Sequence, residues 1–309
     1  MRVAVLCQGT VLQPALAALH SQGLLVGLGA PDRLPEINGP LEHAARQAGI
    51  PFVRVQAAAL EEQLSRWLEE SNPDVVCTMG FPHKIPGPML AMPRLGFFNF
   101  HGGALPQYRG PDPVFWQIRN QEPNGAITIH RIAPELDTGG IAHAEAVPLG
   151  PEDTYGLHLQ RLGAVLPRLV IELVQQLEIH GERLPLSEQP AAGAHYWKRP
   201  TEADLTVDWT GAAAAIQALV RACNPTYAGA LTLMKGIPVR LLQVTCGMGY
   251  TCEEVMPGTM VGASTDTGIL VACGQGQTLF LDIVYAQDGF FTGQQLVKLF
   301  GLGAGEQMG

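Results

Sequence analysis

A chain of 309 residues with 47% hydrophobic and 15% charged side chains is long enough for two domains and apolar enough to give each a core. Its formal net charge of −9 argues against a broad nucleic-acid-binding surface. We find no signal peptide and no apolar stretch long enough to span a membrane, so we expect a cytoplasmic protein without a membrane partner. The six cysteines form neither a disulfide framework nor a zinc pattern, and no metal is expected.

The first two-thirds of the chain alternates strand-like and helix-like segments. Strands are predicted at residues 3–7, 24–28, 52–55, 74–79, 96–100 and 126–130. Helices are predicted at residues 14–21, 40–47, 58–70 and 153–180, and Pro167 is expected to kink or interrupt the last of them. This alternation predicts an α/β domain with a Rossmann-like parallel sheet and helices on both of its faces.

The last third of the chain has a different pattern. Residues 188–202 are rich in proline and small residues and are predicted to be a linker, which places the first domain at residues 1–187 and the second at residues 203–309. A helix at residues 211–223 precedes short strands at 230–234, 239–244, 258–264, 268–272 and 278–284. Such closely spaced strands predict a small barrel or sandwich.

Two polar side chains end the predicted strand at residues 96–100. Asn99 and His101 are two positions apart, so on a strand they project to the same face, at the carboxyl end where ligands bind in such sheets. Asp137 lies in a glycine-rich loop after the next predicted strand. An amide donor, an imidazole and a carboxylate suit acyl transfer, because they can hold an oxyanion, move a proton and orient the imidazole.

Other polar residues nearby have a simpler interpretation. His130 is interpreted as structural, and His83 and Lys84 as part of a solvated loop. Arg109 is either a solvated loop charge or a group that binds a carboxylate or phosphate of a substrate.

The spacing of these motifs resembles a known family. Asn99-x-His101-Gly102-Gly103-x-Leu105-Pro106-x-Tyr108-Arg109-Gly110 is followed by Thr128-Ile129-His130 and Leu136-Asp137-Thr138-Gly139. This series is similar to the N10-formyltetrahydrofolate-dependent formyltransferases, which act on methionyl-tRNA, on a lipid A aminoarabinose precursor or on amino sugars. Residues from Arg199 to Gly274 resemble that family's second, OB-like domain, so the resemblance covers essentially the whole chain.

The resemblance implies roles for individual residues. Asn99 would donate to the oxyanion, His101 would assist removal of the proton from the amine, and Asp137 would orient His101 or position a water. The pterin of the co-substrate N10-formyltetrahydrofolate would lie against Met79, Gly80, Phe81, Ile85, Pro86, Ala133, Pro134, Glu135 and Leu136. The residues expected on the acceptor side are Gly102, Gly103, Tyr108 and Arg109.

Two departures from the family pattern bear on the acceptor. Gly103 and Ala104 stand where the family usually has Ser and a bulkier Leu. Residues 30–39 are short and nearly neutral where the tRNA enzymes carry a basic insertion, so little electrostatic grip on a tRNA is expected. We therefore predict formyl transfer to an amine or hydroxylamine of a small metabolite, such as an amino sugar, an amino acid or a natural-product intermediate. A methionyl-tRNA formyltransferase and an inactive folate-binding module are the alternatives, and the oligomeric state is left open.

Overall fold

The computed structural model describes the backbone of residues 1–309 and all side chains except those of Thr10 and Pro35. The chain divides into two compact units. Unit 1 comprises Met1–Pro113, Asn124–Pro148 and Leu159–Lys198, and unit 2 comprises Val114–Pro123, Leu149–His158 and Arg199–Gly309. The predicted linker is thus divided between them, because its residues up to Lys198 belong to unit 1.

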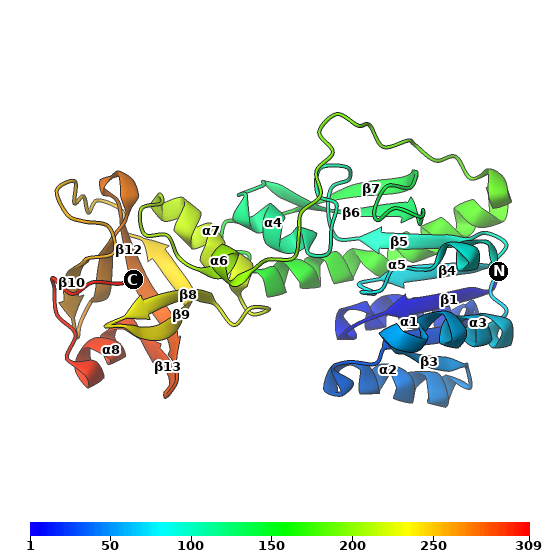
Figure 1. The fold of residues 1–309 in the computed structure, drawn as a ribbon, viewed down its shortest axis with the longest axis horizontal. Coiled ribbons are helices and arrows are strands. Elements are labelled where there is room, and N and C mark those ends of the chain that lie inside the picture. Colours follow the sequence, from blue (N-terminus) through cyan, green and yellow to red (C-terminus); the bar gives the residue numbers. More distant parts are fainter. The chain divides into compact units, whose positions relative to one another are not determined.

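Unit 1 is built on a seven-stranded sheet with the strand order β3-β2-β1-β4-β5-β6-β7 (Figure 1). The strands are β1 (Val3–Cys7), β2 (Leu25–Pro31), β3 (Phe52–Val55), β4 (Val75–Met79), β5 (Phe97–His101), β6 (Asn124–Arg131) and β7 (Ile141–Pro148). The first five strands are parallel, which confirms the predicted Rossmann-like α/β class. The sheet departs from an all-parallel one at β6 and β7, which pair antiparallel with their neighbours.

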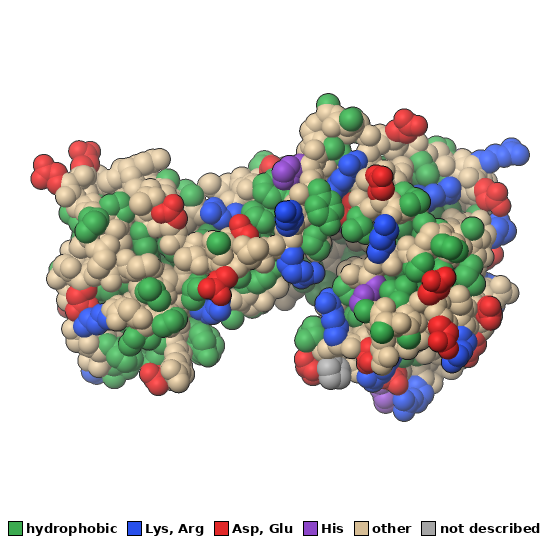
Figure 2. Space-filling model, in the orientation of Figure 1, with side chains coloured by type: hydrophobic (Ala, Val, Ile, Leu, Met, Phe, Trp, Pro, Cys, Tyr) green, Lys and Arg blue, Asp and Glu red, His purple; other side chains and the backbone are tan. Residues whose placement is uncertain are grey.

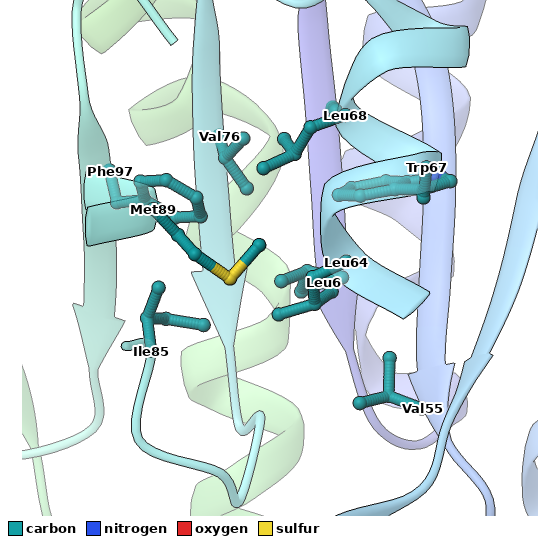
Figure 3. Close-up of a cluster of buried hydrophobic side chains, with 10 residues drawn as sticks. Leu6, Val55, Leu64, Trp67, Leu68, Val76, Ile85, Met89 and Phe97 are labelled. Atoms are coloured by element: carbon teal, nitrogen blue, oxygen red, sulfur yellow. The ribbon is translucent and has the colours of Figure 1, made fainter. Parts of the chain in front are cut away.

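Helices cover this sheet. They are α1 (Gln13–Ser21), α2 (Pro35–Ala48), α3 (Leu60–Ser71) and α5 (Tyr155–His180), the last of which begins in unit 2. On the face of α3, Trp67, Leu64 and Leu68 pack with strand residues into a buried apolar cluster (Figure 3). α3 lies so close to β2 that a Cβ on Gly27 would be 2.8 Å from the Cβ of Ser71.

The predicted interruption of the long helix at Pro167 does not occur, because α5 continues through it. Proline removes one hydrogen bond from the helix. Residues on both sides of it bury apolar side chains, among them Leu166, Leu169, Val170 and Leu173. Burial of this stripe outweighs the local cost of the proline.

The apolar face under α3 leads directly to the polar residues singled out above. Phe97 is buried in the α3 cluster, and Asn99 and His101 follow it on the same face of β5. On the neighbouring strand β4, Val76 lies in the cluster and Thr78 follows it on the same face. At the carboxyl edge of the sheet, the apolar core therefore gives way to a set of polar side chains on β4 and β5.

Unit 2 is β-rich, as predicted. Its elements are α4 (Pro113–Arg119, which starts at the last residue of a unit 1 segment), α6 (Glu202–Leu205), α7 (Ala213–Cys223), β8 (Ala230–Met234), β9 (Ile237–Cys246), β10 (Met260–Ser264), β11 (Gly268–Ala272), β12 (Thr278–Ala286), β13 (Gly289–Thr292) and α8 (Gly293–Phe300). Its strands form an antiparallel sheet with the order β10-β11-β12-β9-β8, and β13 pairs with β12. The Gln217 amide of α7 donates to the Val244 carbonyl of β9, which holds this helix against the sheet. Nowhere in the part of the chain that the structure describes does a helix have the length and apolar character needed to cross a membrane.

Candidate active site

The register between β5 and β6 sets the frame of the site. Asn99 is directly opposite His130, and His101 is directly opposite Thr128. Directly opposed residues of an antiparallel pair project to the same face. The Asn99 amide and the imidazoles of His101 and His130 therefore gather on one side of the sheet.

The orientation of the Asn99 amide is fixed by its two neighbours. The Thr78 hydroxyl donates to Asn99 Oδ1 at 2.8 Å, and Asn99 Nδ2 lies 3.2 Å from His130 Nε2. The oxygen therefore faces Thr78 and the amide nitrogen faces the imidazole. A primary amide has two N–H donors, so one remains after the contact with His130.

His101 is buried, and its surroundings determine which ring nitrogen is basic. Its Nε2 is 2.6 Å from the Tyr108 carbonyl oxygen, which can only accept a hydrogen bond, so Nε2 carries the proton. Nδ1 then holds the lone pair and lies 3.8 Å from Asp137 Oδ1. Burial lowers the pKa of His101 below its ordinary value, although Asp137 and the Tyr108 carbonyl act in the opposite direction. His101 is therefore a neutral base at neutral pH.

Asp137 reaches the same point from the loop between β6 and β7. The Gly110 N–H donates to Asp137 Oδ2 at 2.9 Å, while Oδ1 lies 3.5 Å from His130 Nε2. Burial opposes ionisation of this carboxyl, but His130, His101 and the Gly110 N–H outweigh it and lower the pKa of Asp137. The carboxylate is thus ionised at neutral pH.

The loop itself is tightly constrained. Asp137 has a φ of 55°, in the left-handed region that favours glycine. A Cβ on Gly139 would come within 1.8 Å of the Arg131 carbonyl oxygen. Only glycine therefore allows the loop to pass β6 at this distance.

The sequence analysis interprets His130 as a structural residue, but its contacts place it in the site. Its Nδ1 lies 3.1 Å from the Arg131 carbonyl oxygen and so carries the proton, which leaves the lone pair on Nε2 toward Asn99 and Asp137. The alternating pattern of residues 126–130 predicts the strand on which His130 lies. Placing His130 in the site also requires the knowledge that this strand pairs antiparallel with the strand of Asn99.

A cavity of about 80 Å³ adjoins this cluster. It is lined by Thr78, Phe81, His83, Lys84, Ile85, Asn99, His130, Ile132, Ala133, Glu135, Leu136 and Asp137. Of the residues expected to hold the pterin, Phe81, Ile85, Ala133, Glu135 and Leu136 line it, whereas Met79, Gly80, Pro86 and Pro134 do not. Ligand pockets usually measure about 300–1,000 Å³, so this cavity suits one edge of a flat ring, with the rest of the ligand outside it.

The residues expected on the acceptor side lie elsewhere than in this cavity. Gly103 has no room for a side chain, because a Cβ there would be 2.5 Å from the Pro113 Cβ and 3.2 Å from His101 Nε2. Tyr108 is buried and contributes its carbonyl to His101. Arg109 is half-buried, and its guanidinium donates to the Gln189 side chain instead of pointing to solvent as a free charge. Gly102 lies between His101 and Gly103 at the end of β5 and is likewise half-buried.

Comparison with known proteins places the chain in a family. The model of a family described as formyl transferase matches residues 1–174, and that of the formyl transferase C-terminal domain matches residues 200–297. The chain belongs to the formyl transferase family. The family resemblance inferred from the sequence is therefore confirmed.

Two relatives show how much of the chain this likeness covers. Methionyl-tRNA formyltransferase from Ralstonia nicotianae is 31% identical over 296 residues, which span 89% of this chain and 88% of the relative. The enzyme of the same name from Aromatoleum aromaticum is 32% identical over 237 residues, which span 76% of this chain and 72% of the relative.

Solved structures share the fold at lower identity. An N-formyltransferase from Helicobacter canadensis, in complex with folinic acid and dTDP-3-aminofucose, aligns with a TM-score of 0.69 and 14% identity over 90% of this chain and 98% of its own. HypX from Aquifex aeolicus in complex with tetrahydrofolic acid aligns with a TM-score of 0.65 and 16% identity over 97% of this chain and 47% of its own. The α/β unit and the β-rich unit together are thus the fold of this family.

Proposed function

We propose that this protein transfers the formyl group of N10-formyltetrahydrofolate to the amine or hydroxylamine of a small molecule. One observation carries the proposal. His101 Nδ1 and His130 Nε2 both present lone pairs to Asp137 Oδ1, at 3.8 and 3.5 Å, next to the Asn99 amide donor. His130 Nε2 already accepts from the Asn99 amide, so His101 Nδ1 and Asp137 Oδ1 are the acceptors to which an attacking amine can donate an N–H.

The cavity beside this cluster suits the pterin ring of the formyl donor. Phe81, Ile85 and Leu136 give it apolar walls, and the polar residues Thr78, Glu135 and Asp137 also line it. When bound, the co-substrate would supply the formyl carbon. Two structural neighbours are complexes with folinic acid and with tetrahydrofolic acid, which supports a folate here.

The protein residues then divide the work of the transfer. Asn99 Nδ2 donates to the formyl oxygen as negative charge develops on it. His101 Nδ1 takes the proton of the attacking nitrogen, and the negative charge of Asp137 stabilises the imidazolium that results. The new C–N bond forms as the bond from the formyl carbon to the folate nitrogen breaks, and the proton passes to that departing nitrogen.

The charges of the chain support a small acceptor. Only residues 32–34 separate β2 from α2, and the Arg33 guanidinium there donates to Gln8. Arg54 forms ion pairs with Glu42 and Asp32. In residues 199–309 acidic side chains outnumber basic ones, and in the left part of Figure 2, where most of these residues lie, the two kinds are interspersed. Binding to a polyanion needs clustered cations that are not already paired.

Methionyl-tRNA formylation is the second candidate, and the identity of 31–32% to enzymes of that name favours it. The purified protein can be incubated with N10-formyltetrahydrofolate and either charged initiator tRNA or a panel of amino sugars, amino acids and hydroxylamines. We expect consumption of the folate with a small amine. Consumption with the tRNA alone would select the second candidate.

A binding module without catalysis would consume the folate with none of these acceptors. The matched control is His101→Ala, which removes the base but none of the residues that line the cavity. If the wild type slowly hydrolyses the formyl donor and His101→Ala does not, the protein is an enzyme.

A further inference from the structure

The segment from Leu184 to Lys198, which we call the strap, lies along both loops of the site within unit 1. Ser187 exchanges backbone hydrogen bonds with Ile141, just after the Asp137 loop. Farther along, the backbone of Arg109 accepts from the Trp197 N–H at 2.8 Å and donates to the His195 carbonyl at 3.1 Å. The strap therefore bridges the loop after β5 and the loop before β7.

Gln189 stands between these two attachment points, and its side-chain amide is fully engaged. Its Nε2 donates to the carbonyls of Asp137 and Gly139, each at 2.8 Å. Its Oε1 accepts from Arg109 Nε at 3.0 Å and from Arg109 Nη2 at 2.8 Å. An amide has two N–H donors and two acceptor lone pairs, so all four are used.

These contacts close a ring of hydrogen bonds around Asp137. The ring runs from the Asp137 carbonyl to the Gln189 side chain, on to the Arg109 guanidinium, through the chain to Gly110, and from the Gly110 N–H back to Asp137 Oδ2. Asp137 is thus held from both ends, at its carbonyl and at its carboxylate. This explains how a non-glycine residue keeps a φ of 55°.

We propose that Gln189 is a positioning residue that holds the Asp137 carboxylate against His101 and His130. The inference rests on the proposed function, in which Asp137 stabilises the charge on His101. The proposal gives the strap, whose composition predicts a linker, a role in positioning a catalytic group. It also gives Arg109 the role of orienting Gln189.

Two isosteric variants separate the contacts of this amide. Gln189→Met removes the donors and the acceptor without adding charge. Gln189→Glu keeps an acceptor for Arg109 but loses both donors to the loop carbonyls. Glu188→Gln is the matched control, because Glu188 is the exposed neighbour and belongs to no part of the ring.

We expect both Gln189 variants to lower kcat about 10- to 100-fold, since small displacements of catalytic groups cost rates of this size. The KM for the formyl donor should stay within about twofold, because Gln189 does not line the cavity. In Gln189→Met the acidic limb of the pH profile should also move to lower pH. Asp137 raises the pKa of His101, and a displaced carboxylate raises it less. A purely structural role would leave this limb in place.

The controls separate this proposal from the function on which it rests. If the wild type and Glu188→Gln turn over no acceptor, the proposed function fails, and a crystal structure of Gln189→Met still tests the positioning. That structure should show Asp137 Oδ1 displaced from the 3.5 Å contact with His130 Nε2. An unmoved carboxylate, or a Gln189→Met enzyme as active as Glu188→Gln, would overturn the proposal.

Discussion

Asn99 and His101 reach the site along a strand, whereas Asp137 reaches it from a loop. The positions of the first two follow from the register of β5 with β4 and β6. The position of Asp137 depends on hydrogen bonds from Gly110 and from Gln189, which are distant in sequence. The chain thus builds one half of the site from regular structure and the other half from individual tertiary contacts.

This difference predicts how the two halves respond to substitution. A strand residue keeps its place when a neighbouring side chain changes, because backbone hydrogen bonds hold it. A loop residue moves when a single supporting contact is lost. The loop half should therefore be sensitive to changes outside the reacting groups, and the strand half should be sensitive chiefly to changes of the groups themselves.

The largest effect is expected where the two halves meet. His101→Ala and Asp137→Asn should each lower kcat/KM by about 10²–10⁴, the usual contribution of general acid–base catalysis. The double variant should lose no more than the worse single one, since the two groups serve one proton transfer. Kinetics of all three variants would test this, and additive losses would show that the residues act in separate steps.

The second effect concerns the strand half alone. Asn99→Ala should lower kcat by about 10²–10³, the cost of losing an oxyanion donor. Thr78→Val removes the hydroxyl that orients the amide and should cost roughly fivefold, or about 1 kcal/mol. Thr78→Ser keeps the hydroxyl and is the control. Equal rates for the Val and Ser variants would show that Asn99 needs no orientation.

The third test compares a glycine of the Asp137 loop with a glycine that follows β5. A Cβ at Gly139 meets a backbone carbonyl at 1.8 Å, whereas a Cβ at Gly103 meets a proline side chain at 2.5 Å. Both alanine variants should lower the free energy of unfolding by about 1–3 kcal/mol, as overpacking does. Gly139→Ala should also lower kcat about tenfold or more, because it displaces the Asp137 loop.

The control for this comparison is Gly87→Ala, because that position has open space. Thermal denaturation gives the stabilities and steady-state assays give the rates. A Gly139→Ala enzyme with full activity would contradict the sensitivity assigned to the loop.

The smallest effect is a pH dependence. His101 acts when neutral, and burial holds its pKa below the ordinary value of 6.5. Activity, corrected for the fraction of acceptor amine that is unprotonated, should therefore be constant from about pH 7 to 8 and fall only as the pH drops below about 6.5. The profile of kcat/KM, measured with a formyl donor that is stable in acid, checks this. An inflection above pH 6.5 would mean that His101 gains its proton more readily than its burial allows.

The same contrast explains what the sequence predicts and what it does not. Alternation and hydrophobic runs locate β1, β3 and β4 to within a residue, because these strands are buried and strongly patterned. They do not reveal β7, where Val147 is the only buried residue of an otherwise exposed or half-exposed strand. Edge strands carry a weak pattern because little of them enters the core.

The site shows the same division. Asn99 and His101 are predictable from their spacing on one strand. His130 is not, because its place opposite Asn99 depends on β6 being antiparallel to β5. Gln189 is even harder to predict from the sequence, because its partners Asp137 and Arg109 lie 52 and 80 positions away. A polar residue in a proline-rich segment also carries no sequence pattern that would indicate a role in the site.

The face-to-face pairing of Asn99 with His130 has a consequence for how the sequence of such a chain can vary. The chain leaves the sheet after His101 and returns at Asn124, and the ladder between these two strands restores the alignment however long that excursion is. Insertions and deletions between Gly110 and Asn124 therefore leave the reacting atoms at their spacing, whereas changes at Tyr108, Arg109 or Gly110 would move His101 or Asp137. The length of that stretch and the chemistry of the site can therefore vary separately in this architecture.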